Sequence, residues 1–156
     1  TVSALVNQKG GVGNTTTAVN VAAFLARAGK RVLLGDLDPQ ANASSGLGVK
    51  LSENDQHIYH AMLEPDQSSG TVQSTAVDGL HAMPSHRDLA GAAVELVSVE
   101  EREYRLRKAL DTMRHMYDYI IIDCPPSLGL LTINGLVAAD HILIPVQAEY
   151  YALEGL

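Results

Sequence analysis

A glycine-rich segment near the start of the chain holds the residue types that bind phosphate. Residues 7–17 read NQKGGVGNTTT, between an apolar run at residues 2–6 and an amphipathic run at residues 18–28. A strand, a glycine-rich loop and a helix in this order form a phosphate-binding loop. Glycines let backbone N–H groups approach phosphate oxygens, and the helix N-terminus adds a positive dipole end. The segment predicts a nucleotide site with Thr15 placed to bind Mg²⁺; the alternative is a glycine-rich turn in an unrelated α/β protein.

The loop departs from the pattern G-x-x-x-x-G-K-[ST] at two positions. It matches at Gly13 and Thr15, but Gln8 stands at the first glycine and Asn14 stands at the lysine. The Asn14 amide can still donate a hydrogen bond, but it is uncharged and shorter than a lysine side chain. Losing a buried, charge-assisted contact costs about 2–5 kcal/mol. That cost corresponds to about 30-fold to several-thousand-fold in affinity, so we expect impaired ATP binding and little hydrolysis.

Acidic residues follow two short apolar runs. Residues 31–35 are followed by Asp36 and Asp38, and residues 119–122 are followed by Asp123. Strand–helix–strand units imply a parallel sheet, in which ligands bind at the carboxyl ends of the strands. Asp123 has the Walker B arrangement, in which a buried strand holds a carboxylate that reaches Mg²⁺ through a water. Asp36 and Asp38 can face the same metal and phosphates, and an Asx turn before the following proline is the alternative.

The rest of the chain continues the alternation of strands and helices, which predicts an α/β fold with a doubly wound, mostly parallel sheet flanked by helices. We expect helices at residues 58–63, 88–97, 100–116 and 132–139, a strand at 80–83, and a buried strand at 141–146. His57 and His60 have the spacing of a ligand pair, but no third ligand has suitable spacing, so no metal site is predicted there. The basic residues near position 105 alternate with glutamates, as on a solvated helix face.

Composition limits the classes to which the protein can belong. The chain has 156 residues, 46% of them hydrophobic, which suits one domain with a sizeable core. Its single cysteine, Cys124, excludes an internal disulfide and is expected to be a packing residue in a reducing, cytoplasmic setting. There is no long apolar run and no recognisable leader, so no membrane association is expected. The net charge is −7, and no cluster of lysines and arginines is dense enough to form a binding patch for nucleic acid.

Three ordered motifs resemble those of the ParA/Soj-type partitioning ATPases, in the ParA/MinD group of P-loop NTPases. The first loop resembles the deviant Walker A motif K-G-G-x-G-K-T, with Lys9 as the additional signature lysine. The segment from Asp36 through residues 42–48 resembles switch I, and Asp123-Cys124-Pro-Pro-Ser resembles switch II. Residues 145–155 also resemble this family. The resemblance covers nearly the whole chain, but only about the N-terminal three-fifths of the usual family domain, so the fold is expected to be incomplete at its C-terminus.

The resemblance implies a weak Mg-ATPase in which ATP is held between two subunits. Lys9 would reach across to the phosphates of the other subunit, Asp38 would orient the attacking water, and Asp36 would support the Mg²⁺ shell with Thr15 and Asp123. The expected nucleotide-binding residues are Lys9, Gly10, Gly11, Val12, Gly13, Asn14, Thr15 and Thr16. Family members form an ATP-dependent homodimer, coat non-specific DNA on the nucleoid and respond to a ParB/Spo0J-type partner during chromosome or plasmid segregation.

Two alternatives remain beside a partitioning ATPase. A truncated or degenerate, non-enzymatic paralogue that pairs with an intact subunit fits Asn14. A MinD-like membrane-associated ATPase fits less well, because the D-P-Q and P-P-S strings belong to the ParA/Soj pattern. DNA binding is not expected of these residues, because the family's basic surface lies in the C-terminal part. An incomplete sheet is also expected to leave an exposed edge that favours self-association.

Overall fold

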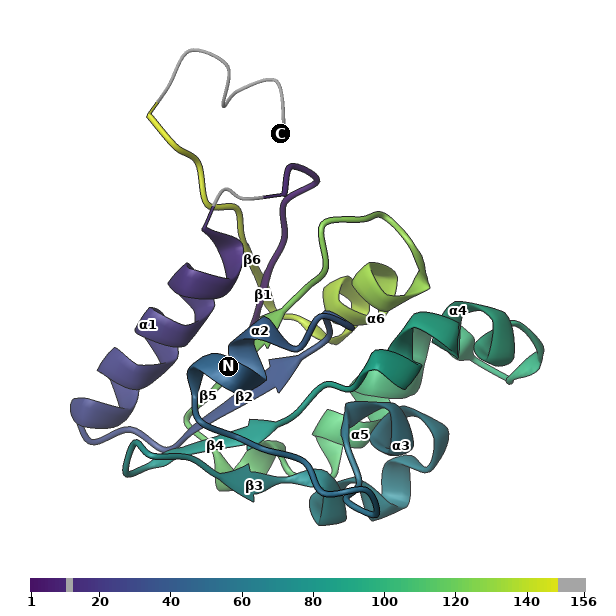
Figure 1. The fold of residues 1–156 in the computed structure, drawn as a ribbon, viewed down its shortest axis with the longest axis horizontal. Helices are drawn as coiled ribbons and strands as arrows, with labels where there is room; N and C mark the ends of the chain where they lie inside the picture. The colour runs from purple at the N-terminus through teal and green to yellow at the C-terminus, as the bar shows by residue number, and fades with distance from the viewer. Residues whose placement is uncertain (11–12, 149–156) are drawn as a thin grey trace.

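A six-stranded sheet forms the centre of the computed structural model, which describes residues 1–10 and 13–148. The strand order is β3-β4-β2-β5-β1-β6, and all neighbouring pairs are parallel except β3 with β4 (Figure 1). The strands are β1 (Val2–Leu5), β2 (Val32–Asp36), β3 (Gln73–Ser74), β4 (Leu80–Met83), β5 (Tyr119–Asp123) and β6 (His141–Leu143). This doubly wound, mostly parallel sheet confirms the predicted fold class.

Helices cover both faces of the sheet (Figure 1). They are α1 (Asn14–Arg27), α2 (Asn42–Gly46), α3 (Ile58–Leu63), α4 (Ala92–Glu95), α5 (Arg105–Asp111) and α6 (Leu130–Ala138). Successive strand residues point to opposite faces, so Ile120 and Ile122 pack with α3, α5 and α6, whereas Ile121 packs with α1 and α2. Ala18, Ala22 and Ala26 form the buried stripe of α1. Small side chains at this spacing let α1 lie close to the sheet.

Five short 3₁₀ segments complete the described chain. They are η1 (Pro65–Thr71), η2 (Arg87–Gly91), η3 (Leu96–Ser98), η4 (Arg102–Tyr104) and η5 (Arg114–Met116).

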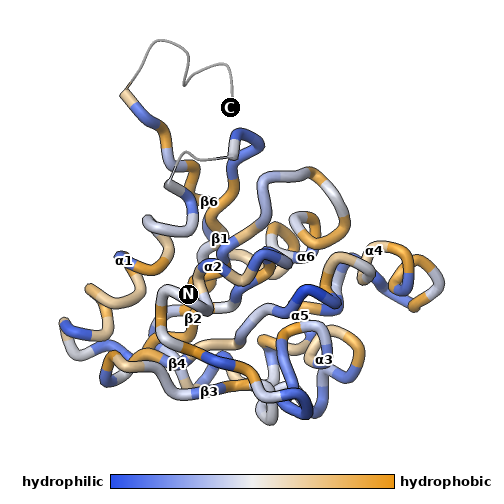
Figure 2. Tube along the Cα trace, in the orientation of Figure 1, coloured by the Kyte–Doolittle hydropathy of each residue, from blue (hydrophilic) through white to orange (hydrophobic). Residues whose placement is uncertain are grey.

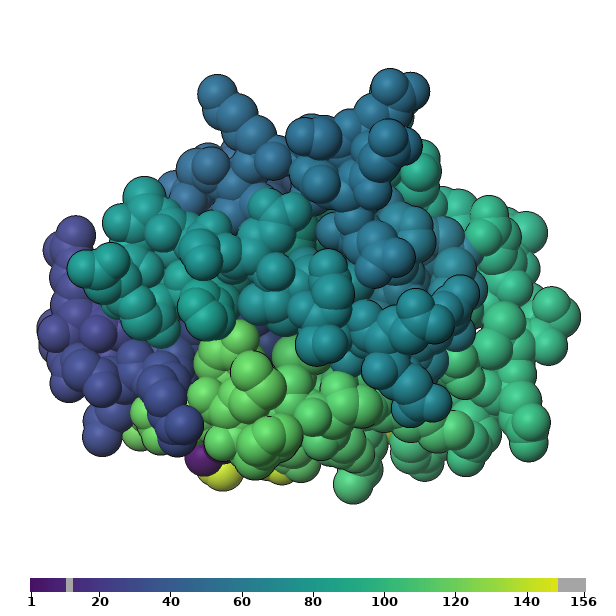
Figure 3. Space-filling model, turned by 90° about the horizontal axis from the view of Figure 1, so that it is seen from below, coloured from purple at the N-terminus to yellow at the C-terminus, as the bar shows by residue number. Residues whose placement is uncertain are grey.

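Figure 3 shows the molecule from below, with α1 in purple-blue at one side and segments near residue 100 in green at the other. The blue and teal surface between them belongs to the middle of the chain, which carries α3, η1 and β3.

Two predicted helices are wrong as continuous elements. Residues 88–97 divide into η2, α4 and η3, and residues 100–116 divide into η4, α5 and η5. The second helix starts late because Glu101 has φ of 52°, a left-handed conformation that a helix cannot contain. It ends early where the Thr112 hydroxyl donates to the Ala109 carbonyl, 2.8 Å away, and competes with the helical hydrogen bonds. The segment nevertheless buries its regularly spaced large apolar side chains, which are those of Leu106, Leu110, Met113 and Tyr117.

The predicted buried strand at residues 141–146 is also wrong in length and burial. β6 contains only three residues, and all three are exposed. It pairs with β1 on one side and forms an edge of the described sheet. An edge strand has one row of unpaired backbone groups and fewer neighbours than a central strand, which explains its exposure.

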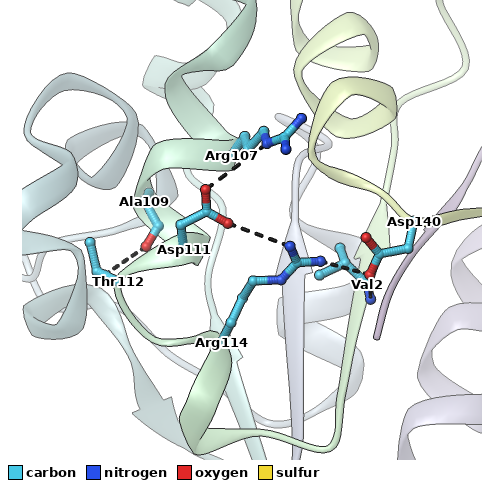
Figure 4. Close-up of polar contacts among 7 residues, drawn as sticks. All are labelled: Val2, Arg107, Ala109, Asp111, Thr112, Arg114 and Asp140. Carbon is cyan, nitrogen blue, oxygen red and sulfur yellow. Dashed lines mark hydrogen bonds and ion pairs between the residues drawn. The ribbon is translucent and has the colours of Figure 1, made fainter.

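A chain of polar contacts connects the helical layer to this edge (Figure 4). The Arg114 guanidinium lies 3.5 Å from Asp111 Oδ1, at the end of α5, and 2.6 Å from Asp140 Oδ2. Asp140 is the residue directly before β6. The same carboxylate accepts a hydrogen bond from the Val2 N–H at 2.8 Å. Asp140 therefore fixes the start of β6 beside the start of β1.

Candidate functional site

The predicted phosphate loop lies where three central strands end. Leu5 at the end of β1 and Asp36 at the end of β2 both pair with Asp123 at the end of β5. Figure 2 shows the loop after β1 as a hydrophilic segment. A cavity of about 430 Å³ opens beside it. Its lining comes from the loop, switch I and switch II: Asn7, Lys9, Gly10, Gly13, Asn14, Thr15, Thr16, Asp38, Gln40, Asn42, Cys124 and Pro126.

Thr15 and Asp123 form the part of the site that suits Mg²⁺. The Thr15 hydroxyl donates to Asp123 Oδ2 at 2.8 Å, so the two predicted metal ligands lie side by side. Burial raises the pKa of Asp123 to about 7, helped by the nearby carboxylates of Asp36 and Asp38. The Thr15 hydrogen bond opposes this shift. A hydroxyl and carboxylates around one point are the oxygen donors that Mg²⁺ prefers, so these residues fit the ion.

Asn14 lies in an environment made of hydrogen-bond acceptors. Its Nδ2 lies 2.8 Å from Asp123 Oδ1, 3.1 Å from the Leu5 carbonyl and 3.2 Å from the Cys124 carbonyl. Its Oδ1 is buried without a hydrogen-bond partner among the described residues. Reversing the amide would place this oxygen against three acceptors, so the orientation is well determined. An amide has two N–H bonds for three acceptors, whereas an ammonium has three.

The two switch I aspartates differ in their surroundings. Asp36 is fully buried, and its Oδ2 accepts from the Ser44 N–H at 2.9 Å and the Ser44 hydroxyl at 2.7 Å. Its Oδ1 accepts from the Asp38 N–H at 3.1 Å. Burial raises the pKa of Asp36 although these hydrogen bonds oppose the shift. Both oxygens thus hold the segment after β2, while Asp38 is only partly buried and lines the cavity.

Two serines that were not predicted as site residues hold the segment around Asp38. Ser85, after β4, donates from its hydroxyl to the Asp38 carbonyl at 2.6 Å and from its N–H to Ser44 Oγ at 3.0 Å. Ser44 belongs to the switch I string and therefore carried a signal, but nothing in the local sequence of Ser85 indicates this contact. Together they position the backbone of Asp38 at the cavity.

The other predicted site residues are placed as follows. Lys9, Gly10 and Thr16 are exposed and line the cavity, and Lys9 N–H donates to Asn7 Oδ1 at 2.8 Å. Gly13 has φ of +82°, a conformation that favours glycine, and precedes α1 directly. Gly11 and Val12, like residues 149–155 of the C-terminal motif, lie outside the described residues.

Cys124 is a packing residue, as predicted. It is 3% exposed, and burial raises the pKa of its thiol, helped by the neighbouring Asp123 carboxylate. A Cβ added to Gly135 would lie 2.6 Å from Cys124 Sγ and 3.2 Å from Leu37 Cδ1. The glycine lets α6 approach β5 at the residue that follows Asp123. None of the helices in the described part of the chain has the length and hydrophobicity needed to span a lipid bilayer.

The whole chain matches one known protein family, and similar proteins share its architecture. A family model described as "AAA domain" matches residues 1–156. The sporulation initiation inhibitor protein Soj of Bacillus subtilis is 54% identical over 99% of this chain, which spans 61% of Soj. The chromosome partitioning protein ParA of Myxococcus xanthus is 57% identical over 96% of this chain, which spans 53% of that protein.

A solved structure gives the same result at the level of the fold. The cobyrinic acid a,c-diamide synthase of Mycobacterium smegmatis with bound ADP and magnesium superimposes with a TM-score of 0.93 at 41% identity. The alignment covers 99% of this chain and 63% of the other. The chain thus spans less than two thirds of these relatives. The family model over residues 1–156 places the chain in the AAA-domain family, and its sequence is similar to those of the Soj and ParA partitioning proteins.

Proposed function

We propose that these residues form the nucleotide-binding part of a ParA/Soj-like, Mg-ATP-dependent partitioning ATPase of the cytoplasm that acts in chromosome or plasmid segregation. The observation that carries the proposal is the hydrogen bond between Thr15 and the buried Asp123, at a point where Thr15 and Asp38 both line the cavity of about 430 Å³. The relatives are named as partitioning proteins, and the similar M. smegmatis structure contains ADP and magnesium.

In the proposed reaction, the protein groups bind and orient ATP and water. Gly13 and the N-terminus of α1 would face the phosphates, and Thr15 and Asp123 would hold Mg²⁺. The ion would neutralise charge on the phosphates. Asp38 orients the attacking water, while Asp36, Ser44 and Ser85 keep the Asp38 backbone in place. Both Asp36 oxygens accept hydrogen bonds from Ser44 or Asp38. Asp36 would therefore support the groups around the ion without binding the ion directly.

We expect Asn14 to weaken ATP binding at this site. Three acceptors surround its Nδ2, and its Oδ1 has no partner among the described residues, so the position suits a lysine ammonium better than an amide. An ammonium would supply a positive charge both to Asp123 and to bound phosphate. Without it, ATP binding is weak and hydrolysis is slow.

The partners follow from the family and extend beyond these residues. The ATP-bound form pairs as a homodimer, with Lys9 of each subunit reaching the phosphates of the other. A ParB/Spo0J-type protein stimulates hydrolysis, and non-specific DNA binds through the C-terminal part of family members. A second candidate function, non-enzymatic pairing with an intact subunit, is favoured by Asn14 alone.

The test is Mg-ATP binding measured by calorimetry on this chain and on the Asn14→Lys variant. We expect the variant to bind at least about 30-fold more tightly, the lower limit for a charge-assisted contact. Equal, tight binding by both chains would contradict the role assigned to Asn14. Absence of binding by both would contradict the proposal that these residues suffice for a nucleotide site.

A further inference from the structure

Three histidine side chains form a cluster, although one of them is distant in sequence from the other two. His57 precedes α3, His60 lies in its first turn, and His86 follows β4. The ring centroids of His57 and His86 lie 4.7 Å apart with an interplanar angle of 17°, so the two rings are stacked. The ring centroids of His57 and His60 lie 4.3 Å apart, with an interplanar angle of 61°. The Ile58 N–H donates to the Pro84 carbonyl at 2.9 Å and holds the two segments together.

Two of these histidines and one aspartate have the spacing of a metal-binding group. One ligand atom each of His57, His86 and Asp88 lies within 4.8 Å of the other two. His57 is 4% exposed, and its Nδ1 is buried without a hydrogen-bond partner in the described part of the chain. A buried ring nitrogen without a partner is costly unless something binds it. The unsatisfied Nδ1 is therefore a second indication of a ligand.

The remaining contacts separate the ligands from their neighbours. His86 Nδ1 accepts a hydrogen bond from the Asp88 N–H at 3.2 Å and lies 3.2 Å from Asp88 Oδ2, so the Asp88 side chain is held beside the His86 ring. His60 Nδ1 already accepts a hydrogen bond from the His57 N–H at 3.1 Å. This nitrogen therefore stabilises the start of α3, and we do not count His60 among the metal ligands. The His86 side chain is 34% exposed and lines a surface hollow, so an ion can enter from solvent.

We propose that His57, His86 and Asp88 form a binding site for a borderline divalent ion such as Zn²⁺, separate from the Mg²⁺ site at Thr15. Two imidazoles and a carboxylate suit Zn²⁺, whereas Mg²⁺ prefers oxygen ligands alone. Binding requires one of the stacked rings to turn about its Cβ–Cγ bond, so that both lone pairs face the ion. The ion then connects the start of α3 to the segment after β4 and stabilises the folded chain by mass action.

The test is Zn²⁺ binding by calorimetry in buffer with excess Mg²⁺, with the visible absorption of Co²⁺ as a second probe. The key variant is His86→Asn, because an asparagine oxygen can still accept the Asp88 N–H while the imidazole is removed. His57→Asn removes the second imidazole, and Asp88→Asn replaces the charged carboxylate with a neutral, weaker oxygen donor. His115→Gln is the control, since His115 is an exposed histidine in η5.

We expect one Zn²⁺ per wild-type chain and a rise in melting temperature on adding the ion. Removing an outer-shell partner of a metal typically lowers affinity about 10–100-fold, so losing a ligand in His86→Asn should cost at least about tenfold. The same loss is expected for His57→Asn, and none for His115→Gln. Melting curves in EDTA check that each variant folds. No binding by the wild type, or equal binding by a folded His86→Asn variant, would overturn the proposal.

Discussion

Single side chains at the phosphate loop show how one substitution changes the electrostatics of a whole site. Asp123, Asp36 and Asp38 place three carboxyl groups near one another, and they raise the pKa of Asp123 together with burial. Asn14 offers this cluster a neutral donor at 2.8 Å. A lysine or Mg²⁺ at the same place would favour the ionised carboxylates. The residue at position 14 therefore affects Asp123, the proposed metal ligand, as well as the proposed phosphate site.

Thr15→Val tests the metal site at this scale, in the Asn14→Lys background, where nucleotide binding is expected to be measurable. Valine keeps the shape of threonine but removes the hydroxyl that contacts Asp123 Oδ2. We expect the enhancement of ADP affinity by Mg²⁺ to fall about tenfold, as for the loss of one hydrogen bond to a charged group. The measurement is ADP titration with and without Mg²⁺.

The control for this experiment is Thr17→Val, two residues further along α1 and outside the cavity lining. Its Mg²⁺ enhancement should match that of the background chain. An unchanged enhancement in Thr15→Val would show that its hydroxyl does not act on the metal.

At the scale of elements, the contact between α6 and β5 depends on one glycine. A methyl group at Gly135 would lie 2.6 Å from Cys124 Sγ, inside van der Waals contact. We expect Gly135→Ala to lower the free energy of unfolding by about 1–3 kcal/mol, the usual cost of overpacking a core. Urea unfolding measures this loss. Gly91→Ala is the control, because the nearest atom to its added Cβ is Glu95 Oε1 at 3.8 Å.

The junction before β5 should give the stability a specific pH dependence. Asp118 accepts from the Arg31 N–H at 2.8 Å and pairs with the guanidinium at 3.1 Å. The Arg31 side-chain hydrogen bond lowers the pKa of Asp118 from 3.8 to about 2. A carboxyl group with a lowered folded-state pKa stabilises the fold above its unfolded pKa, and this contribution disappears as the pH falls through the folded value.

Asp118→Asn should therefore lower the urea midpoint at pH 6 and lower it less at pH 3. Both groups are largely exposed, so the effect should be small and should shrink in high salt. Asp78→Asn, in the exposed turn before β4, is the control for the loss of an exposed carboxylate elsewhere in the chain. A pH-independent difference for Asp118→Asn would contradict the assigned ion pair.

Elements with strong local signals could be predicted with their boundaries. The strand Leu80–Met83 and the helix Ile58–Leu63 are correct to the residue. The helices at 88–97 and 100–116 were predicted too long, because apolar periodicity does not register a left-handed Glu101 or a competing Thr112 hydroxyl. Periodicity also cannot tell an edge strand from a central one, as β6 shows.

At the scale of the whole molecule, the sequence predicted that residues after different strands lie close together. Thr15 and Asp123 are 108 positions apart, yet their proximity could be predicted, because parallel topology brings the carboxyl ends of strands together. Their roles at the proposed site stay a prediction. The histidine cluster could not be predicted in this way. His86 reaches His57 only because the chain after β4 lies against the start of α3.

The edge of the sheet predicts the behaviour of this chain in solution. Ile142, Ile144 and Val146 are each about half exposed at or after β6, and Leu128 is 64% exposed nearby. Leu128 and Ile144 also line an adjoining hollow of about 220 Å³. Apolar residues beside unpaired backbone groups favour pairing with another chain. We expect the chain to self-associate with increasing concentration, as measured by sedimentation velocity.

Ile142→Lys should weaken this association, because a charged residue on an edge strand opposes pairing with a second edge. Val94→Lys is the matched control: Val94 is 80% exposed, but it lies on α4 and not at the sheet edge. If general hydrophobicity caused the association, both lysines would reduce it equally, because both remove an exposed apolar side chain. A selective effect of Ile142→Lys would assign the contact to β6, whereas equal effects would contradict pairing through this strand.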